Sequence, residues 1–338
     1  MRQSAIALVI VAFTSFPALA ADGSSSELAT GGLMFVRDDN LEMLSQDLVI
    51  SPNEVRIHYR MLNRSDKDVT VLVSFPMPEI SIEGADDAPS VPTEDPVNLL
   101  AAATTVNDKP VSVAVEQRVI AAGIDRTQLL RRLGIPLAPH LDSTQEVLDR
   151  LPPDQLENLQ RLGLAETEDY DAGGGMKKHL APRWALQTTY FWEQTFPANS
   201  ETAIDLRYQP SIGRSEQTLL GSANAGKEPW YEELNDKYCF NYEFLAALER
   251  ARKAVNGKFG APFSEQRIEY AHKNWVNALG SPVGEFRLIV DKGAADNLVS
   301  FCGEEAKKIS ETQLEVTKND YMPDDNLSIL FLNKLPQQ

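Results

Sequence analysis

Apolar and polar residues alternate along several stretches of this chain, which is the pattern of strands that bury one face. In residues 55–61 the odd-numbered positions are apolar or aromatic and the even-numbered positions are basic. The same period of two recurs in residues 69–75, after a polar turn, and in the aromatic stretch 184–196. Because successive side chains of a strand point to opposite faces, the pattern predicts half-buried strands, with 55–61 and 69–75 paired as a hairpin.

Residues 125–164 interrupt this alternation with signals typical of helices. Asp125 and Ser143 each stand three residues before a Gln or a Glu, which is the spacing of a capping box, and each precedes a leucine-rich run. Pro153 suits the first turn of a third short helix, because that turn does not need its backbone N–H. We therefore predict a helical insertion at about 125–164.

The last third of the chain combines a helix with strands. Residues 244–255 place apolar side chains on one helical face, and strand patterns follow at 268–272, 286–290, 313–317 and 327–332. Since the helices and strands do not alternate as in βαβ units, antiparallel pairing is favoured. The predicted fold class is α+β and mainly antiparallel β. It has an N-terminal β-sandwich that carries the helical insertion and a smaller α+β unit after it.

Turn-rich and polar stretches divide the chain, and its length suggests about two domains. In chain order we expect a signal peptide (1–20), a flexible leader (21–32), a β-sandwich domain (33–213) with its helical insertion (about 125–164), a linker (214–230) and an α+β C-terminal domain (231–338).

The first twenty residues have the composition of a cleavable export signal. Arg2 precedes the apolar run 5–13, and residues 18–20 form the small-x-small pattern after which signal peptidases cut. The run is too short to span a bilayer, which takes about 20 residues. We predict cleavage between Ala20 and Ala21, a periplasmic or secreted location, and no membrane span after removal of the signal. An uncleaved anchor is the alternative.

Charge and cysteine content refine this picture. The formal net charge of −17 gives the protein no electrostatic reason to bind nucleic acid. Cys239 and Cys302 are the two cysteines, and in an oxidising compartment one structural disulfide is the simplest interpretation. Two buried free thiols or a redox pair are the alternatives, although a redox pair usually has C-x-x-C spacing.

The sequence contains no recognisable catalytic or metal-binding motif. It has no Gly-x-Ser-x-Gly elbow, and the glycine run 173–175 lacks the Lys-Ser/Thr of a phosphate-binding loop. The histidines do not have zinc-ligand spacing; they are His58, His140, His179 and His272. We assign no catalytic residue, no metal ligand and no cofactor, while carboxylate pairs that meet only in space stay open.

Aromatic residues are the remaining candidates for ligand contact. Tyr190 and Trp192 lie in one strand pattern, and Trp230 and Tyr231 stand beside the predicted linker. Exposed rings of this kind stack on sugars or anchor peptides. The alternative is that they pack in the core or at a domain interface.

Several segments together resemble a known family. They are residues 22–33 (DGSSSELATGGL), 48–52 (LVISP) with 55–59, 63–68 (NRSDKD), 75–78 (FPMP) and 207–210 (RYQP). On these the chain resembles the bacterial exported family catalogued as domain of unknown function 4424, over nearly the whole mature length. The resemblance implies a periplasmic or secreted protein and brings neither an activity nor any functional residue.

The N-terminal part is also similar to the VIT domain, a β-sandwich that likewise passes from an Asn-x-Ser turn into a Phe-Pro-x-Pro stop. The helical insertion and the lack of an adjoining von Willebrand-type metal site depart from that family, so the similarity supports a sandwich and nothing more. From all this we expect a non-catalytic binding or interaction protein of the bacterial envelope, with an envelope protein as partner. The alternatives are a periplasmic hydrolase with dispersed carboxylates and a structural component of a surface assembly, and the oligomeric state stays open.

Overall fold

The structure is a computed structural model. It describes residues 25–82, 89–171, 175–222, 224–255, 261–272, 280–303 and 305–336. The predicted signal peptide and its cleavage site between Ala20 and Ala21 lie outside these ranges. No helix in the described ranges is both long enough and apolar enough to cross a membrane.

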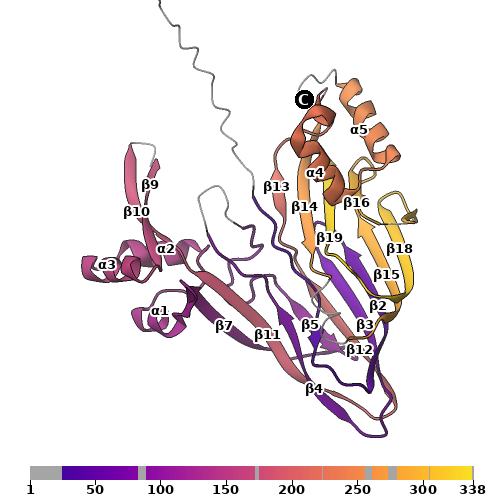
Figure 1. The fold of residues 1–338 in the computed structure, drawn as a ribbon, viewed down its shortest axis with the longest axis horizontal. Coiled ribbons are helices and arrows are strands. Elements are labelled where there is room, and N and C mark those ends of the chain that lie inside the picture. The colour runs from indigo at the N-terminus through magenta and orange to yellow at the C-terminus, as the bar shows by residue number, and fades with distance from the viewer. Residues whose placement is uncertain are drawn as a thin grey trace, which may run out of the picture.

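The largest sheet contains strands from both halves of the chain. Among the described residues its eight strands have the order β17-β18-β15-β2-β3-β12-β5-β6 (Figure 1). Their bounds are β2 (Leu41–Ile50), β3 (Val55–Asn63), β5 (Ala103–Val106), β6 (Lys109–Pro110), β12 (Ser200–Tyr208), β15 (Val283–Asp291), β17 (Lys307–Lys308) and β18 (Gln313–Tyr321). All neighbours pair antiparallel except β15, which runs parallel to β2. The mainly antiparallel α+β fold class is thus confirmed.

A second sheet packs on the first and completes the sandwich. In the part of the chain that the structure describes, its five strands have the order β1-β4-β11-β7-β8. They are β1 (Met34–Phe35), β4 (Val69–Pro76), β7 (Ala114–Ala121), β8 (Ile124–Asp125) and β11 (Ala185–Phe196). Phe75 and Tyr190 of this sheet share one hydrophobic core with Ile57 and Leu206 of the larger sheet.

The predicted hairpin of residues 55–61 and 69–75 is wrong, because β3 and β4 belong to different sheets. Asn63 holds the corner at which the chain changes sheets. Its buried side-chain amide donates to the backbone oxygens of Lys67 (2.8 Å) and Phe196 (2.9 Å), and its side-chain oxygen accepts from the Ser65 N–H (2.9 Å). Alternation along a strand shows which face is buried but not which sheet the strand joins.

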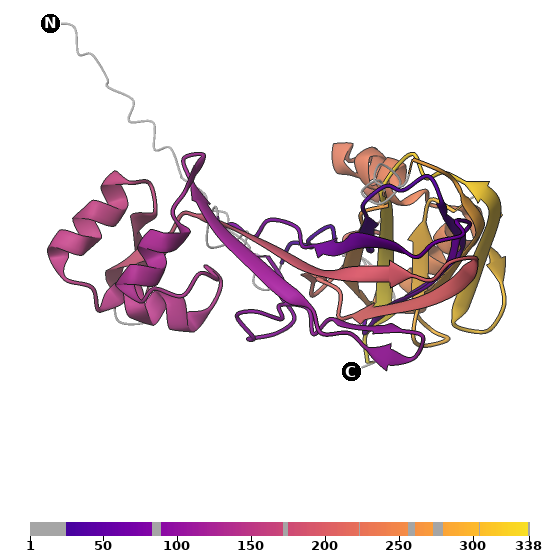
Figure 2. The same cartoon turned by 90° about the horizontal axis from the view of Figure 1, so that it is seen from below.

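The helical insertion forms a lobe at one end of the molecule, as Figure 2 shows. Three short helices and a two-stranded sheet build it: α1 (Thr127–Leu133), α2 (Asp142–Asp149), α3 (Pro153–Arg161), β9 (Ala165–Asp171) and β10 (Met176–Pro182). They surround a core of their own in which Trp184 is buried with Val119, Leu148 and Leu159. The Trp184 ring N–H donates to the Leu137 carbonyl at 2.8 Å, so this large ring is buried without losing its hydrogen bond.

The C-terminal part adds a four-stranded sheet and two α-helices at the other end. The sheet has the order β13-β14-β19-β16. The elements are β13 (Gly213–Ser215), η1 (Ala225–Lys227), α4 (Pro229–Tyr238), α5 (Tyr242–Ala254), β14 (Phe263–Tyr270), β16 (Leu298–Phe301) and β19 (Leu327–Lys334). A disulfide between Cys239 and Cys302 joins the end of α4 to the residue after β16. Because β15 of this part pairs with β2, strands of the two predicted domains share one sheet, and the division between them stays a prediction.

Residues 30–33 lie in the core, although the sequence analysis treats 21–32 as a flexible leader. Thr30 pairs with the end of β14, since its N–H donates to the Glu269 carbonyl and its own carbonyl accepts from the Ala271 N–H. The Tyr208 hydroxyl donates to the carbonyls of Thr30 (3.2 Å) and Gly31 (3.1 Å). Small and polar residues favour loops on average, and here the lack of side chains at Gly31 and Gly32 is what lets the backbone enter the core.

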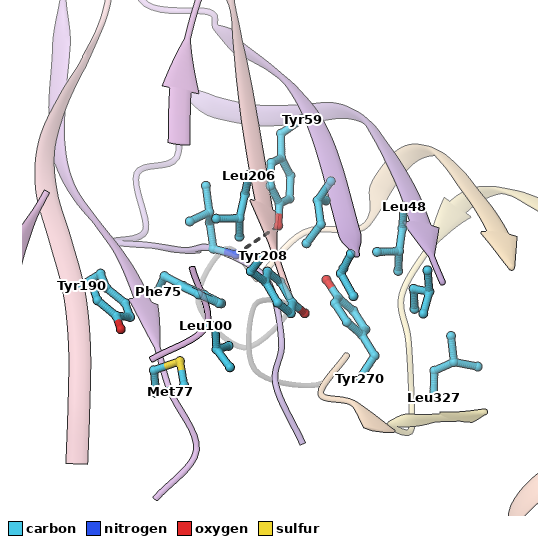
Figure 3. Packing of buried hydrophobic residues seen from close by; sticks show 14 of the residues in the cluster. Leu48, Tyr59, Phe75, Met77, Leu100, Tyr190, Leu206, Tyr208, Tyr270 and Leu327 are labelled. Carbon is cyan, nitrogen blue, oxygen red and sulfur yellow. Dashed lines mark hydrogen bonds between the residues drawn. The ribbon is translucent and has the colours of Figure 1, made fainter. Parts of the chain in front are cut away.

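Gly32 leaves no space for a side chain. Its backbone passes between the hydroxyls of Tyr59 and Tyr270, and an added Cβ would collide with the first and lie 2.8 Å from the second. The Tyr59 hydroxyl accepts a hydrogen bond from the Leu33 N–H at 3.0 Å, drawn as the dashed line in Figure 3. Burial raises the pKa of both hydroxyls far above the usual value, so they stay protonated and act as neutral hydrogen-bonding groups.

We expect Gly32→Ala to lower the free energy of unfolding by about 3 kcal/mol, because the new methyl group overpacks a rigid core. The matched control is Gly226→Ala, since nothing lies within 4 Å of a Cβ built there. The control should change stability by about 0.5 kcal/mol or less. Urea unfolding of the three proteins measures this. Equal midpoints for Gly32→Ala and the control would show that the side chains around Gly32 shift to make room for the methyl group.

We also expect the double substitution Cys239→Ala with Cys302→Ala to cost about 4 kcal/mol, since the bond closes a 63-residue separation and restricts the unfolded chain. Urea midpoints of the oxidised, reduced and substituted proteins test this. Reduction should also add two hydrogens to the intact mass. Identical masses with and without reductant would contradict the bond itself.

Candidate functional site

The histidines occupy four separate environments. His58 bonds Asp205 at 2.8 Å on an outer sheet face, and His179 lies 3.6 Å from Glu168. His140 lies half-buried in the lobe with both ring nitrogens buried, and His272 packs edge-on against the Tyr270 ring. Within the described ranges, no three His, Cys, Asp or Glu residues are grouped so that they could hold a metal ion.

The four aromatic residues that the sequence proposes as ligand contacts take packing positions. Tyr190 and Trp192 are 4% and 7% exposed, which leaves little surface for a ligand. The Tyr190 hydroxyl donates to the Val97 carbonyl at 2.7 Å. Trp230 and Tyr231 are half-buried against the core beneath α4 and α5. A role in ligand contact stays a prediction for all four.

A different set of residues forms an open groove between β7 and α1. The groove has a volume of about 1080 Å3, and four of its lining residues are Arg118, Arg126, Arg131 and Arg132. We call it the arginine groove. Two carboxylates, those of Glu116 and Asp125, also line it.

Local backbone structure places α1 beside β7. The chain turns back at Ala122 and Gly123, both with positive φ (50° and 75°), and pairs β8 with β7. The hydroxyl of Thr127 accepts from the Val119 N–H at 2.8 Å, so the first residue of α1 is fixed to the strand. Asp125 accepts from the Thr127 N–H at 2.9 Å, one position earlier than the predicted capping box would require.

A loop fixes the other end of α1. Gly134 ends the helix in the left-handed conformation with φ of 68°. The next residues run over the lobe core, where the Ala138 carbonyl accepts from the Thr144 hydroxyl at 2.6 Å. His140 lies in this loop with both ring nitrogens buried and without a hydrogen-bond partner, and burial lowers its pKa to about 4. The lobe thus holds a neutral histidine close to the helix that carries the arginines.

The charges in the groove are only partly balanced. Glu116 pairs with Arg118, with 2.7 Å between its carboxylate oxygen and the Arg118 Nε. The pKa of Asp125 is lowered, first by the hydrogen bonds from Thr127 and then by the nearby Arg118 and Arg131. In the described part of the chain Arg126, Arg131 and Arg132 make no ion pair; they do line the groove. The Nε atom of Arg126 is buried without a hydrogen-bond acceptor.

The groove continues onto the outer face of the second sheet. A neighbouring hollow of about 360 Å3 lies over β4, β11 and β7 and shares Glu116, Arg118 and Phe191 with the arginine groove. Leu72, which is 43% exposed, lines its far side. The combined surface therefore offers guanidinium groups beside apolar side chains, an arrangement that suits recognition of a carboxylate-bearing chain.

Sequence reasoning missed this site because its arginines, although close in sequence, do not form a recognised motif. Arg131 and Arg132 stand in a leucine-rich run where basic residues near a helix end are ordinary. Arg118 belongs to a strand pattern, and only the β7–β8 turn brings it close to them. The one available signal is the local excess of arginine within a strongly acidic chain.

Comparison with known proteins places the chain in a family. Residues 21–330 match the family model described as "Domain of unknown function (DUF4424)". The chain belongs to this family. No curated protein matches it.

Among solved structures, this DUF4424 member is similar to a chain from Legionella pneumophila subsp. pneumophila str. Philadelphia 1 whose printed description is "putative nutrient binding protein". The two share 15% identity with a TM-score of 0.45, over 91% of this chain and 72% of the other.

The buried His140 gives this DUF4424 protein an acid-sensitive lobe. Its pKa of about 4 in the fold lies below the unfolded value of roughly 6.5, so the unfolded chain binds the proton first as the pH falls. The free energy of unfolding should therefore decrease between about pH 6.5 and pH 4, by up to about 3 kcal/mol from this group.

His140→Leu should flatten that part of the stability curve, as measured by urea unfolding at closely spaced pH values. Some dependence should remain, because burial also lowers the pKa of His272, to about 3. The two proteins are compared by how steeply their free energy of unfolding changes with pH. The constant difference between them at pH 8 is subtracted first. Parallel curves down to pH 4 would mean that His140 is protonated in the folded state.

Proposed function

We propose that this protein is an exported, non-catalytic binding protein whose arginine groove takes an acidic segment of a partner protein. The observation that carries the proposal is a cluster of three arginines without ion pairs, in the described residues, on a chain of net charge −17. A protein this acidic repels anions over most of its surface, so a local excess of positive charge directs them to one place.

Arg126 supports a ligand that brings its own acceptor. A buried N–H donor without an acceptor costs roughly 1–3 kcal/mol, and Arg126 Nε is such a donor. Arg126 also lines the groove, so a carboxylate that entered it would gain a charge-assisted hydrogen bond from this guanidinium group.

The shape of the surface supports a polypeptide partner. The groove is open, and it continues into the hollow that Leu72 and Phe191 line. Interfaces between proteins combine arginine with apolar anchors in this way. In the partner segment, an apolar residue next to the acidic one would pack on the apolar side chains of the hollow.

Export is the second element of the proposal. The disulfide between Cys239 and Cys302 suits an oxidising compartment, and the family match begins at residue 21, directly after the predicted cleavage site. A periplasmic or secreted protein meets other envelope proteins, which is where we expect the acidic partner to be found.

The test uses a labelled hexaglutamate peptide and the triple variant Arg126→Gln, Arg131→Gln, Arg132→Gln. Wild-type protein should bind the peptide in a fluorescence anisotropy titration, with an affinity that falls as salt rises. The variant should bind about tenfold more weakly, because each partly exposed ion pair contributes on the order of 0.5 kcal/mol.

A matched control removes the same amount of charge elsewhere. Arg37→Gln, Arg64→Gln and Arg150→Gln change side chains that are 65%, 64% and 75% exposed and lie outside the groove. The control should bind hexaglutamate like wild type, and hexaglutamine should not bind to any of the proteins. Equal losses in both triple variants would attribute binding to overall charge and refute the groove.

A further inference from the structure

A second hollow, of about 690 Å3, lies on the outer face of the largest sheet over β2, β3, β12 and β5. We call it the outer hollow. Its floor consists of side chains that point away from the core, while their chain neighbours Leu48, Ile57 and Leu206 are buried on the inner face. It lies on a different sheet from the arginine groove, and the two share no lining residue.

Strand register arranges the charges of the outer hollow in two rows. Asp47, His58 and Asp205 are direct neighbours across β2, β3 and β12 and form the first row. Two residues further along the strands, Val49, Arg56 and Arg207 are neighbours in the same way and form the second row. An acidic row therefore lies beside a basic row on one surface.

Two of these charges have no ion-pair partner among the residues that the structure describes. Asp205 accepts from His58, and Arg56 pairs with Glu54 at 3.2 Å. Asp47 and Arg207 make no ion pair within the described ranges. Arg287, the register neighbour of Asp47 on β15, pairs instead with Glu315 at 2.7 Å.

The basic row carries an electrostatic cost of its own. Arg56 and Arg207 stand directly opposite each other on paired strands, and like charges in that position destabilise a sheet. An anionic group held between the two guanidinium groups would remove the repulsion and gain hydrogen bonds with both.

The spacing of the rows selects the length of the ligand. Residues i and i+2 of a strand are about 6.7 Å apart, so a ligand with one charge on each row needs its charges at that separation. In a free α-amino acid the ammonium and carboxylate are joined through one carbon atom, which is too short. One further residue in extended conformation separates the two ends by about 6 Å.

We propose that the outer hollow binds a zwitterionic peptide of dipeptide length, with its carboxylate between Arg56 and Arg207 and its ammonium on Asp47. Val49, Ala103 and Pro110 also line the hollow and provide apolar contact at the sides of the two rows. The proposal is independent of the arginine groove and of any partner bound there.

Calorimetric titration with alanylalanine tests it. We expect a Kd of about 1 mM, and binding about fivefold weaker for free alanine, N-acetyl-alanylalanine and alanylalanine amide, since each loses one charge or the right spacing. If the amide and the acetylated peptide bind as well as alanylalanine, the two-row recognition is refuted.

Two variants assign the ends of the ligand. Asp47→Asn should weaken alanylalanine about fivefold and leave the weaker N-acetyl-alanylalanine unchanged, because that peptide has no ammonium group. Arg207→Gln should do the same for the carboxylate, with the amide unaffected. Both positions are on the surface, and circular dichroism confirms that the variants are folded. No heat of binding with wild-type protein, or equal effects of each variant on all ligands, would overturn the proposal.

Discussion

The rest of the structure depends on the passage of the N-terminal segment through the core at Gly32. The backbone crosses between the hydroxyls of Tyr59 and Tyr270 with no room for a Cβ, and Tyr208 binds the two carbonyls just before it (Figure 3). Tyr59 belongs to β3, Tyr208 to β12 and Tyr270 to β14, so one short segment joins strands of two sheets. Because each buried backbone group needs a partner, these tyrosines are what allow a loop to lie where apolar side chains would otherwise pack.

This internal arrangement leaves the outer sheet faces free to carry charge. The inner face of the largest sheet is covered by the five-stranded sheet and the four-stranded sheet. The tyrosine hydroxyls form hydrogen bonds with the backbone that crosses this core. The arginine groove therefore forms where the helical lobe meets the outside of one sheet, and the outer hollow forms on the outside of another. The outer hollow rests on strands alone, whereas the arginine groove combines a strand with α1; regular elements of both kinds hold charged side chains at fixed spacing and so favour selective binding.

Much of the secondary structure could be predicted from local pattern. Alternation located β3, β4 and β11, and helix signals located the insertion that contains α1, α2 and α3. The disulfide was predictable as well, because two cysteines allow only one pairing. The sheet change at Asn63 and the burial of residues 30–33 were not predictable, since both depend on hydrogen-bond partners more than 100 residues away in sequence, Phe196 and Tyr208. The candidate site escaped for a different reason, because its four arginines are close in sequence and only the turn between β7 and β8 brings Arg118 close to the other three.

By itself the sequence determined the family, the mainly antiparallel β class, the helical insertion and the acidity that makes a basic groove informative. These follow from short-range periodicity and from composition, which do not change when the chain folds. The tertiary structure alone decided which strands share a sheet, that the glycine-rich segment is buried, and where opposite charges form adjacent rows. Those features depend on register between strands that are distant in sequence, and register is fixed only when both strands pack against a common core.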